Sequence, residues 1–421
     1  MVSIRIHLVD LASRTPRSEA IRRLARGNTK PWSKVLGCFL IFVNTYGIAS
    51  TYGAYQSFYQ TSRLTHYSPS AISWIGTVQV FLLGLVGVIA GPFFDSGYTR
   101  SVLSLGCGLI VFGYLMLSLS HNYVHILLSQ GVCIGIGQGL TYVPAVAAVA
   151  DAFTNMRPIA LGIGATGAAV GGVVLPIMFN QLITSIGFDW VNRVFALMTL
   201  VISISAVILL GKNIRHGTSR NLLVDKSATR ELPFVLLCLG LFLVELGYWI
   251  PPFTVPIYAE VKVRSATDVS FYILAIMNAG SFAGRIMPAY LAQVQRVGPA
   301  WVLVAGAFSL GTLILCWMAV QSRTSLIVWA FLVGFMSGIT VSMPNAVLPR
   351  LSPSHVLGVR SGMMWSFVSF AALIGAPIAG ILVNTKTNDF RKAQMFSGIS
   401  ICLGAFMLCV PAWHIAKNRN E

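Results

Sequence analysis

Two charged residues lie within stretches that are otherwise apolar, and they are the strongest candidates for chemistry. Glu245 is twelve residues into the apolar stretch 233–257, and Arg285 lies eight residues before the end of the stretch 269–293. An ionised side chain at the centre of a membrane helix costs at least about 2.5–3.5 kcal/mol, so its presence there indicates function. Arg285 carries the fork of N–H groups that binds a carboxylate or another organic anion. Glu245 could be its counter-ion or a group that takes up and releases a proton; the alternative is an ion pair that only fastens two helices together.

Polar and aromatic residues recur at helical spacing in these and similar stretches, and they are candidates for the lining of a cavity. Tyr248 and Trp249 follow Glu245 by three and four residues, whereas Asn278 and Ser281 precede Arg285 by seven and four. Each of these side chains could instead hydrogen-bond a neighbouring helix. The full set of candidates for substrate binding is Arg285, Glu245, Asn278, Ser281, Tyr55, Asn44, Tyr142, Tyr248 and Trp249.

The composition defines the environment of these residues. Of 421 residues, 56% are apolar and only 10% are charged, and the mean hydropathy is +0.76. A soluble globular chain has about 25% charged residues, so the composition excludes a soluble enzyme, a disordered chain and a nucleic-acid binder. The seven cysteines form no Cys-x-x-Cys pair and the seven histidines are scattered. We therefore expect no metal, no cofactor and no enzymatic activity.

Twelve apolar stretches are long enough to cross a bilayer, which needs roughly 20 residues per helix. They divide six and six around one long connection, and they predict an all-α polytopic membrane protein. The predicted organisation is a basic cytoplasmic tail at 1–34, a six-helix bundle at 35–210, a cytoplasmic loop at 211–232, a second six-helix bundle at 233–416 and a cytoplasmic tail at 417–421.

The lysines and arginines predict the orientation in the membrane. If the N-terminus is cytoplasmic, 20 of the 29 lie on cytoplasmic segments and seven on the outer loops. Cytoplasmic segments of membrane proteins carry such an excess. The net charge of +17 therefore needs no nucleic acid to explain it. We expect both termini in the cytosol and a monomer in the plasma membrane, with the vacuolar membrane as the alternative.

The two halves of the chain repeat one pattern. Residues 135–141 and 334–340 both have the form Gly-x-x-x-Gly-x-Thr, 199 positions apart, and Pro-Ile occurs at 176–177 and again at 377–378. Matches at nearly one offset predict a parallel duplication of a six-helix unit. Transporters that rock two bundles about a central site are built in this way.

The connection between the second and third apolar stretches has a more specific motif. Residues 91–100 read Gly-Pro-Phe-Phe-Asp-Ser-Gly-Tyr-Thr-Arg, and further motifs stand in order at 248–253 and 278–288. Together these resemble the major facilitator superfamily, in particular its monocarboxylate-transporter-like branch in filamentous fungi. The resemblance implies a gate at Asp95, Arg100 and Arg157 and an anion-binding role for Arg285. The sequence departs from the family pattern at Gln293, which stands where family members carry a cytoplasmic aspartate in the second half of the chain.

These observations predict a secondary active transporter that moves a small organic anion or metabolite by alternating access. No nucleotide-binding pattern is present in the sequence, so an ion gradient or exchange would drive it. The expected partners are a small-molecule substrate, the lipid bilayer and, if transport is proton-coupled, protons. A sensor or receptor on the same fold, which binds without transporting, is the alternative.

Overall fold

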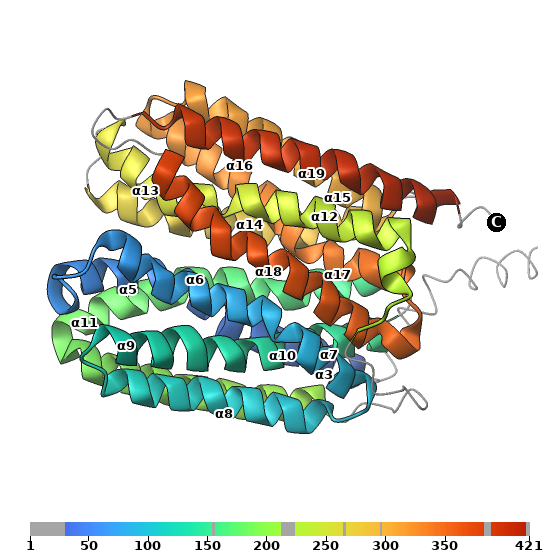
Figure 1. The fold of residues 1–421 in the computed structure, drawn as a ribbon, viewed down its shortest axis with the longest axis horizontal. Helices are drawn as coiled ribbons and strands as arrows, with labels where there is room; N and C mark the ends of the chain where they lie inside the picture. The colour runs from blue at the N-terminus through green and yellow to red at the C-terminus, as the bar shows by residue number, and fades with distance from the viewer. Residues whose placement is uncertain are drawn as a thin grey trace, which may run out of the picture.

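The computed structural model describes residues 30–153, 156–211, 224–263, 267–294, 297–382 and 389–417. The first 29 residues of the predicted basic tail, most of the predicted central loop and the last four residues lie outside these ranges. The described part is almost entirely helical, and its helices form two adjacent bundles, one from each half of the chain (Figure 1).

The N-terminal half contains six membrane-crossing segments. Several are built from consecutive helical pieces, and two of them include π-helical turns: the first segment contains η1 and η2, and the fourth contains η3. The segments are α3 (Lys30–Phe42) with η1 (Val43–Gly47), α4 (Ile48–Ser50), α5 (Tyr52–Phe58) and η2 (Tyr59–Arg63); α6 (Pro69–Leu85) with α7 (Gly87–Asp95); α8 (Thr99–Ser118); α9 (Tyr123–Ile126) with η3 (Leu127–Ile134) and α10 (Gly135–Ala152); and α11 (Arg157–Leu210), which supplies two. Gly187 divides α11 because its φ of 75° is not helical.

The C-terminal half has the corresponding six segments, preceded by the short turn η4 (Ala228–Arg230). They are α12 (Leu232–Tyr248) with α13 (Ile250–Val261); α14 (Thr267–Val294); α15 (Gly298–Cys316) with η5 (Trp317–Ala319); α16 (Arg323–Ser342) with α17 (Pro344–Val347) and η6 (Leu348–Arg350); η7 (Ser354–Val356) with α18 (Leu357–Leu382); and α19 (Arg391–Lys417). Ten helices of the described ranges are long and apolar enough to span a membrane. Gly187 divides one of these ten helices, α11, into two spans. The helix α14 is not among the ten and supplies the twelfth span. The predicted arrangement of twelve helices in two bundles is therefore confirmed.

The helices pack through small residues and expose their large apolar ones. A Cβ atom on Gly47 would lie 2.9 Å from the Cα atom of Gly171, so the first and fifth segments touch backbone to backbone. Close approach of this kind is typical of membrane helices, where glycine and other small residues form the contacts. Large apolar side chains such as Leu105 and Phe406 are exposed on the outside of the bundles, where lipid replaces water as the solvent.

The two halves are held together at one end of the molecule. We call this end the terminal side, because helices that alternate in direction bring Lys30, Lys417 and residues 224–231 to it (Figure 1). There α7 packs against the start of α18 so closely that a Cβ atom on Gly358 would lie 2.5 Å from the carbonyl oxygen of Gly91.

The hydrogen bonds between the halves lie on the same side or near mid-depth. Ser366 of α18 donates to the carbonyl of Leu85 and accepts from the N–H of Val88. The molecule is therefore closed at the terminal side.

Candidate functional site

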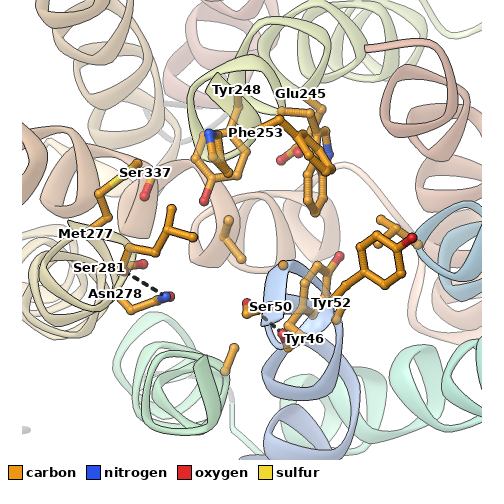
Figure 2. A pocket seen from close by; sticks show the side chains of 18 of the residues that line it. Tyr46, Ser50, Tyr52, Glu245, Tyr248, Phe253, Met277, Asn278, Ser281 and Ser337 are labelled. Carbon is orange, nitrogen blue, oxygen red and sulfur yellow. Dashed lines mark hydrogen bonds between the residues drawn. The ribbon is translucent and has the colours of Figure 1, made fainter. Parts of the chain in front are cut away.

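A cavity of about 1050 Å³, its open side included, lies between the two halves. Its lining comes from the first, second and fifth segments of the N-terminal half and from α12, α13, α14 and α16. Figure 2 shows side chains from both halves that surround the space. The polar and aromatic lining residues are Tyr46, Ser50, Tyr52, Glu245, Tyr248, Trp249, Phe253, Asn278, Ser281, Arg285 and Ser337.

Arg285 is buried in the wall of the cavity, with 5% of its surface exposed. Its Nη1 group donates a hydrogen bond to the carbonyl oxygen of Ala165 in the other half, and its Nε–H has no hydrogen-bond partner among the described residues. A buried donor without a partner is costly. The guanidinium therefore has donor capacity left for an acceptor that enters the cavity, and a carboxylate is the strongest such acceptor.

Glu245 lines the same cavity and is 7% exposed. Its carboxylate lies beside the indole of Trp249. Although Glu245 and Arg285 are both described, no ion pair joins them within 4.0 Å. The pair therefore does not fasten α12 to α14 in this conformation, and the cavity presents one positive and one negative side chain separately.

The other predicted residues of the C-terminal half also reach the cavity. Asn278 donates from Nδ2 to the carbonyl oxygens of Gly172 (3.3 Å) and Leu274 (3.0 Å), so it also links the two halves. Tyr248 and Trp249 present neighbouring rings whose centroids are 5.9 Å apart. Ser281 completes this wall beside Met277 and Asn278 (Figure 2).

The predicted residues of the N-terminal half lie elsewhere. Asn44 donates to the hydroxyl oxygen of Ser203 (3.1 Å), and the hydroxyl of Tyr55 donates to Asn192 Oδ1 (2.8 Å), so both link the first and sixth segments. The hydroxyl of Tyr142 accepts from Asn345 Nδ2 at 3.3 Å, which connects the two halves. None of the three lines the cavity, although all three residues are described.

Sequence reasoning missed the residues that the first segment does contribute. Tyr46, Ser50 and Gly53 lie four and three residues apart on one helical face, and that face lines the cavity. The face through Asn44 and Tyr55 points into the bundle instead. Asn44 and Tyr55 do share one face, as helical spacing predicts, but that face packs against the sixth segment, and the spacing alone does not indicate which face borders the cavity. The i, i+4 pair of Tyr46 and Ser50 was the available signal.

Asp95 joins the halves on the terminal side. It is buried at the end of α7, and its Oδ1 and Oδ2 atoms accept hydrogen bonds from the backbone N–H groups of Gly358 (2.9 Å) and Val359 (2.8 Å). These are among the first N–H groups of α18, which have no partner within the helix. A carboxylate at such an end is stabilised by the helix dipole as well as by the hydrogen bonds.

The two arginines of the expected gate have different surroundings. Arg157 donates from Nε to the carbonyl oxygens of Ala150 (2.7 Å) and Phe153 (3.0 Å), and it thereby caps the end of α10. Arg100 is exposed in the first turn of α8 and forms no ion pair with Asp95, both residues being described.

Arg360 is a further buried charge that sequence reasoning did not select. Its side chain is 3% exposed and pairs with Asp225 (2.8 Å) and Glu231 (2.6 Å), two residues just before α12. Partial burial opposes ionisation of Asp225, but hydrogen bonds from Ser227 and Arg360 outweigh it and hold the pKa of Asp225 below its usual value. Arg360 directly follows Val359, so one turn of α18 holds both Asp95 and the end of the central loop.

Within the described ranges, no three His, Cys, Asp or Glu side chains are grouped so that they could hold a metal ion.

Two six-helix bundles that close on a central cavity define a membrane transporter. The sequence model of the Major Facilitator Superfamily matches residues 36–376. The chain belongs to this superfamily.

Curated relatives from filamentous fungi match nearly the whole chain. The MFS-type transporter dbaD of Emericella nidulans is 33% identical over 386 residues, which cover 91% of this chain and 86% of the relative. The aspyridones efflux protein apdF of the same species is 31% identical, covering 90% of this chain and 77% of the relative. The fujikurins efflux protein of Gibberella fujikuroi is 32% identical, covering 91% and 82%.

Solved structures share the fold at low sequence identity. The human organic anion transporter MFSD10 superposes with a TM-score of 0.71 at 14% identity, over 91% of this chain and 99% of that one. The fucose:proton symporter FucP of E. coli superposes with a TM-score of 0.67 at 15% identity, over 90% and 98%. At these identities the likeness establishes the architecture alone.

Proposed function

We propose that this protein is a secondary active transporter that moves a small organic anion, such as an acidic product of fungal secondary metabolism, by alternating access. The observation that carries the proposal is Arg285, a buried guanidinium in the cavity wall with an unused N–H donor. The aromatic rings of Tyr46, Tyr248 and Trp249 would pack against the apolar part of such a substrate. Two relatives are named as efflux proteins, one for aspyridones and one for fujikurins, which supports the export of a fungal metabolite.

We assign Glu245 the role of a proton carrier. It is the one acidic residue among the described residues that line the cavity, and a carboxylate is a side chain that can take up and release a proton. Proton uptake from one side and release to the other would couple the gradient to transport. This role fits a carboxylate that is not already paired with Arg285.

We place both chain ends in the cytosol, as the distribution of Lys and Arg predicts. The closed terminal side is then the inner side, and the cavity faces outward in this conformation. Asp95 is the inner gate, because its bonds to α18 must break when that side opens. Arg157 supports the gate through the end of α10. We further propose a monomer of the monocarboxylate-transporter-like branch, in the plasma membrane or alternatively in the vacuolar membrane.

Transport by the reconstituted protein tests the proposal. Proteoliposomes would be loaded with the acidic fraction of a culture extract from the organism of origin, and efflux of each compound would be followed by mass spectrometry. We expect the wild type to release one or more organic acids and Arg285→Met to release none. The matched control is Arg193→Met, because Arg193 lies over the ring of Trp190 (4.7 Å) and outside the cavity lining.

Two results would contradict the proposal. Equal efflux by the wild type and Arg285→Met would remove the anion-binding role. Binding of a compound without any efflux would instead favour the sensor or receptor.

A further inference from the structure

We propose that a groove on the outside of the N-terminal half binds one anionic glycerophospholipid. The phosphate would lie against Arg100 and an acyl chain would lie over Gly108. The groove is separate from the central cavity, and the inference does not depend on the proposed substrate. It runs between α8 and the second half of α11 and encloses about 690 Å³, its open side included.

The shape of the groove follows from the spacing of its residues. Each of the two helices contributes one stripe whose residues are one, three or four positions apart, a spacing that places the stripe on a single face. The residues from α8 are Arg100, Ser104, Cys107, Gly108 and Val111, and those from α11 are Leu200, Ser203, Ile204, Val207 and Ile208. The stripe on α8 extends over eleven positions, about 16 Å at 1.5 Å per residue, which suits an elongated ligand that lies along the helices.

Gly108 leaves the floor of the groove open. A Cβ atom added to Gly108 would meet no atom within 4 Å. By contrast, a Cβ atom on Gly106 of the same helix would lie 2.7 Å from the carbonyl oxygen of Gly137. Gly106 therefore serves helix packing, whereas Gly108 faces unfilled space. The flanking side chains of Ile204 and Ile208 are apolar and exposed, as the walls of an acyl-chain site should be.

The polar end of the groove lies where the membrane meets water. Tyr98 and Phe93 are exposed beside the start of α8, with ring centroids 6.4 Å apart. Exposed aromatic residues are enriched at the depth of the lipid headgroups. Arg100 follows Tyr98 by two residues, so its guanidinium reaches the same depth. Basic pockets between membrane helices at this depth are typical binding sites for anionic headgroups.

The charge of the groove selects the class of lipid. Arg100 is the one charged side chain among the described residues that line it. It forms no hydrogen bond or ion pair with another residue of the described ranges. A lipid with net negative charge neutralises this arginine, whereas a zwitterionic lipid brings a cation of its own. One basic residue near the membrane surface favours anionic lipid by a factor of about five.

Native mass spectrometry of the full chain in detergent tests the headgroup preference. Dioleoyl phosphatidylserine and dioleoyl phosphatidylcholine differ in headgroup and share their acyl chains, so each would be titrated against the same protein. We expect the wild type to retain one phosphatidylserine about five times more readily than phosphatidylcholine. Arg100→Gln should remove that preference. The matched control Arg230→Gln changes an exposed arginine of the terminal side outside the groove and should keep it.

Photocrosslinking tests the place of binding. A phosphatidylserine with a diazirine in its acyl chain should label peptides that contain residues 104–111 or 200–208. Gly108→Phe should abolish that labelling, because the ring would occupy the open floor. Leu105→Phe is the matched control, since Leu105 is exposed on the same helix outside the groove lining, and it should leave the labelling intact. The proposal is wrong if the wild type binds both lipids equally, if Arg100→Gln keeps the preference, or if Gly108→Phe keeps the labelling.

Discussion

Asp95 of the N-terminal half accepts a hydrogen bond of 2.9 Å from the backbone N–H of Gly358 in the C-terminal half. Its second carboxylate oxygen binds the next N–H group, that of Val359. The carboxylate thus caps a helix to which it is not connected in sequence. Because the two residues belong to different halves, the bond exists only while the terminal side is closed.

Asp95→Asn should shift the conformational equilibrium towards a protein that is open at the terminal side. The amide keeps one acceptor but loses the charge, and a charge at a helix N-terminus contributes about 0.3–2 kcal/mol. Spin labels at Ser101 and His355, both exposed, would report the distance between the halves by pulsed electron spin resonance. We expect an additional population at longer distance.

The control for the gate is Asp189→Asn. Asp189 pairs with Arg63 at 3.2 Å within the N-terminal half, so its loss should leave the distance distribution unchanged. If Asp95→Asn also left it unchanged, Asp95 would have no role in holding the terminal side closed.

Arg285→Lys should transport the organic anion at least about tenfold more slowly than the wild type, although the charge is kept. An ammonium group lacks the planar fork that binds a carboxylate with two parallel bonds. Initial rates in proteoliposomes would measure the effect, with Arg193→Lys as control. A variant as fast as the wild type would mean that Arg285 acts only as a point charge.

Glu245→Gln should abolish the dependence of net transport on the proton gradient and preserve exchange of labelled for unlabelled substrate. Exchange requires the substrate-bound protein to interconvert between its inward-open and outward-open conformations, but it requires no net movement of protons. The two assays would be run on the same proteoliposomes at external pH 5.5 and 7.5. Loss of exchange together with net transport would show that Glu245 is needed for binding or folding instead.

The ion pairs of Arg360 should make thermal stability depend on pH. The pKa of Asp225 is lower in the folded protein than its usual value near 4. Its contribution is therefore fully present above the usual value and is lost as the pH falls through the lower, folded value. The melting temperature of the wild type should exceed that of Asp225→Asn at pH 6, and the difference should be smaller at pH 3 because the contribution is lost as the pH falls through the folded pKa. A difference that is equal at both pH values would exclude the pairing.

Much of the fold follows from simple features of the sequence. Twelve apolar stretches and one long polar connection specify the helices. Within the hydrocarbon core of a membrane, the backbone N–H and C=O groups can hydrogen-bond only to one another, which favours helices. Glu245 and Arg285 stood out for the same reason, since each interrupts an apolar stretch. The structure brings both to one cavity from two different helices, although they are 40 positions apart.

Other features depend on relationships that the sequence does not display. Tyr46 rather than Asn44 faces the cavity, and helical spacing alone does not indicate which face of the first segment borders it. In the sequence alone, nothing distinguishes Arg360 from the other basic residues near helix ends. Its partners Asp225 and Glu231 are 135 and 129 positions away, and only the folded chain brings them together.

The pairing of Arg360 with Asp225 and Glu231 also defines where one half ends and the other begins. Residues 224–231 belong to the C-terminal bundle, because their ion pairs are made with α18. The covalent joint between the bundles is therefore confined to the stretch from Gly211 to Val224. A gene divided within that stretch would leave all three residues of these ion pairs on the C-terminal polypeptide. Co-expressed, the fragments should reassemble into a working protein, whereas a division after Arg230 would separate Arg360 from Asp225.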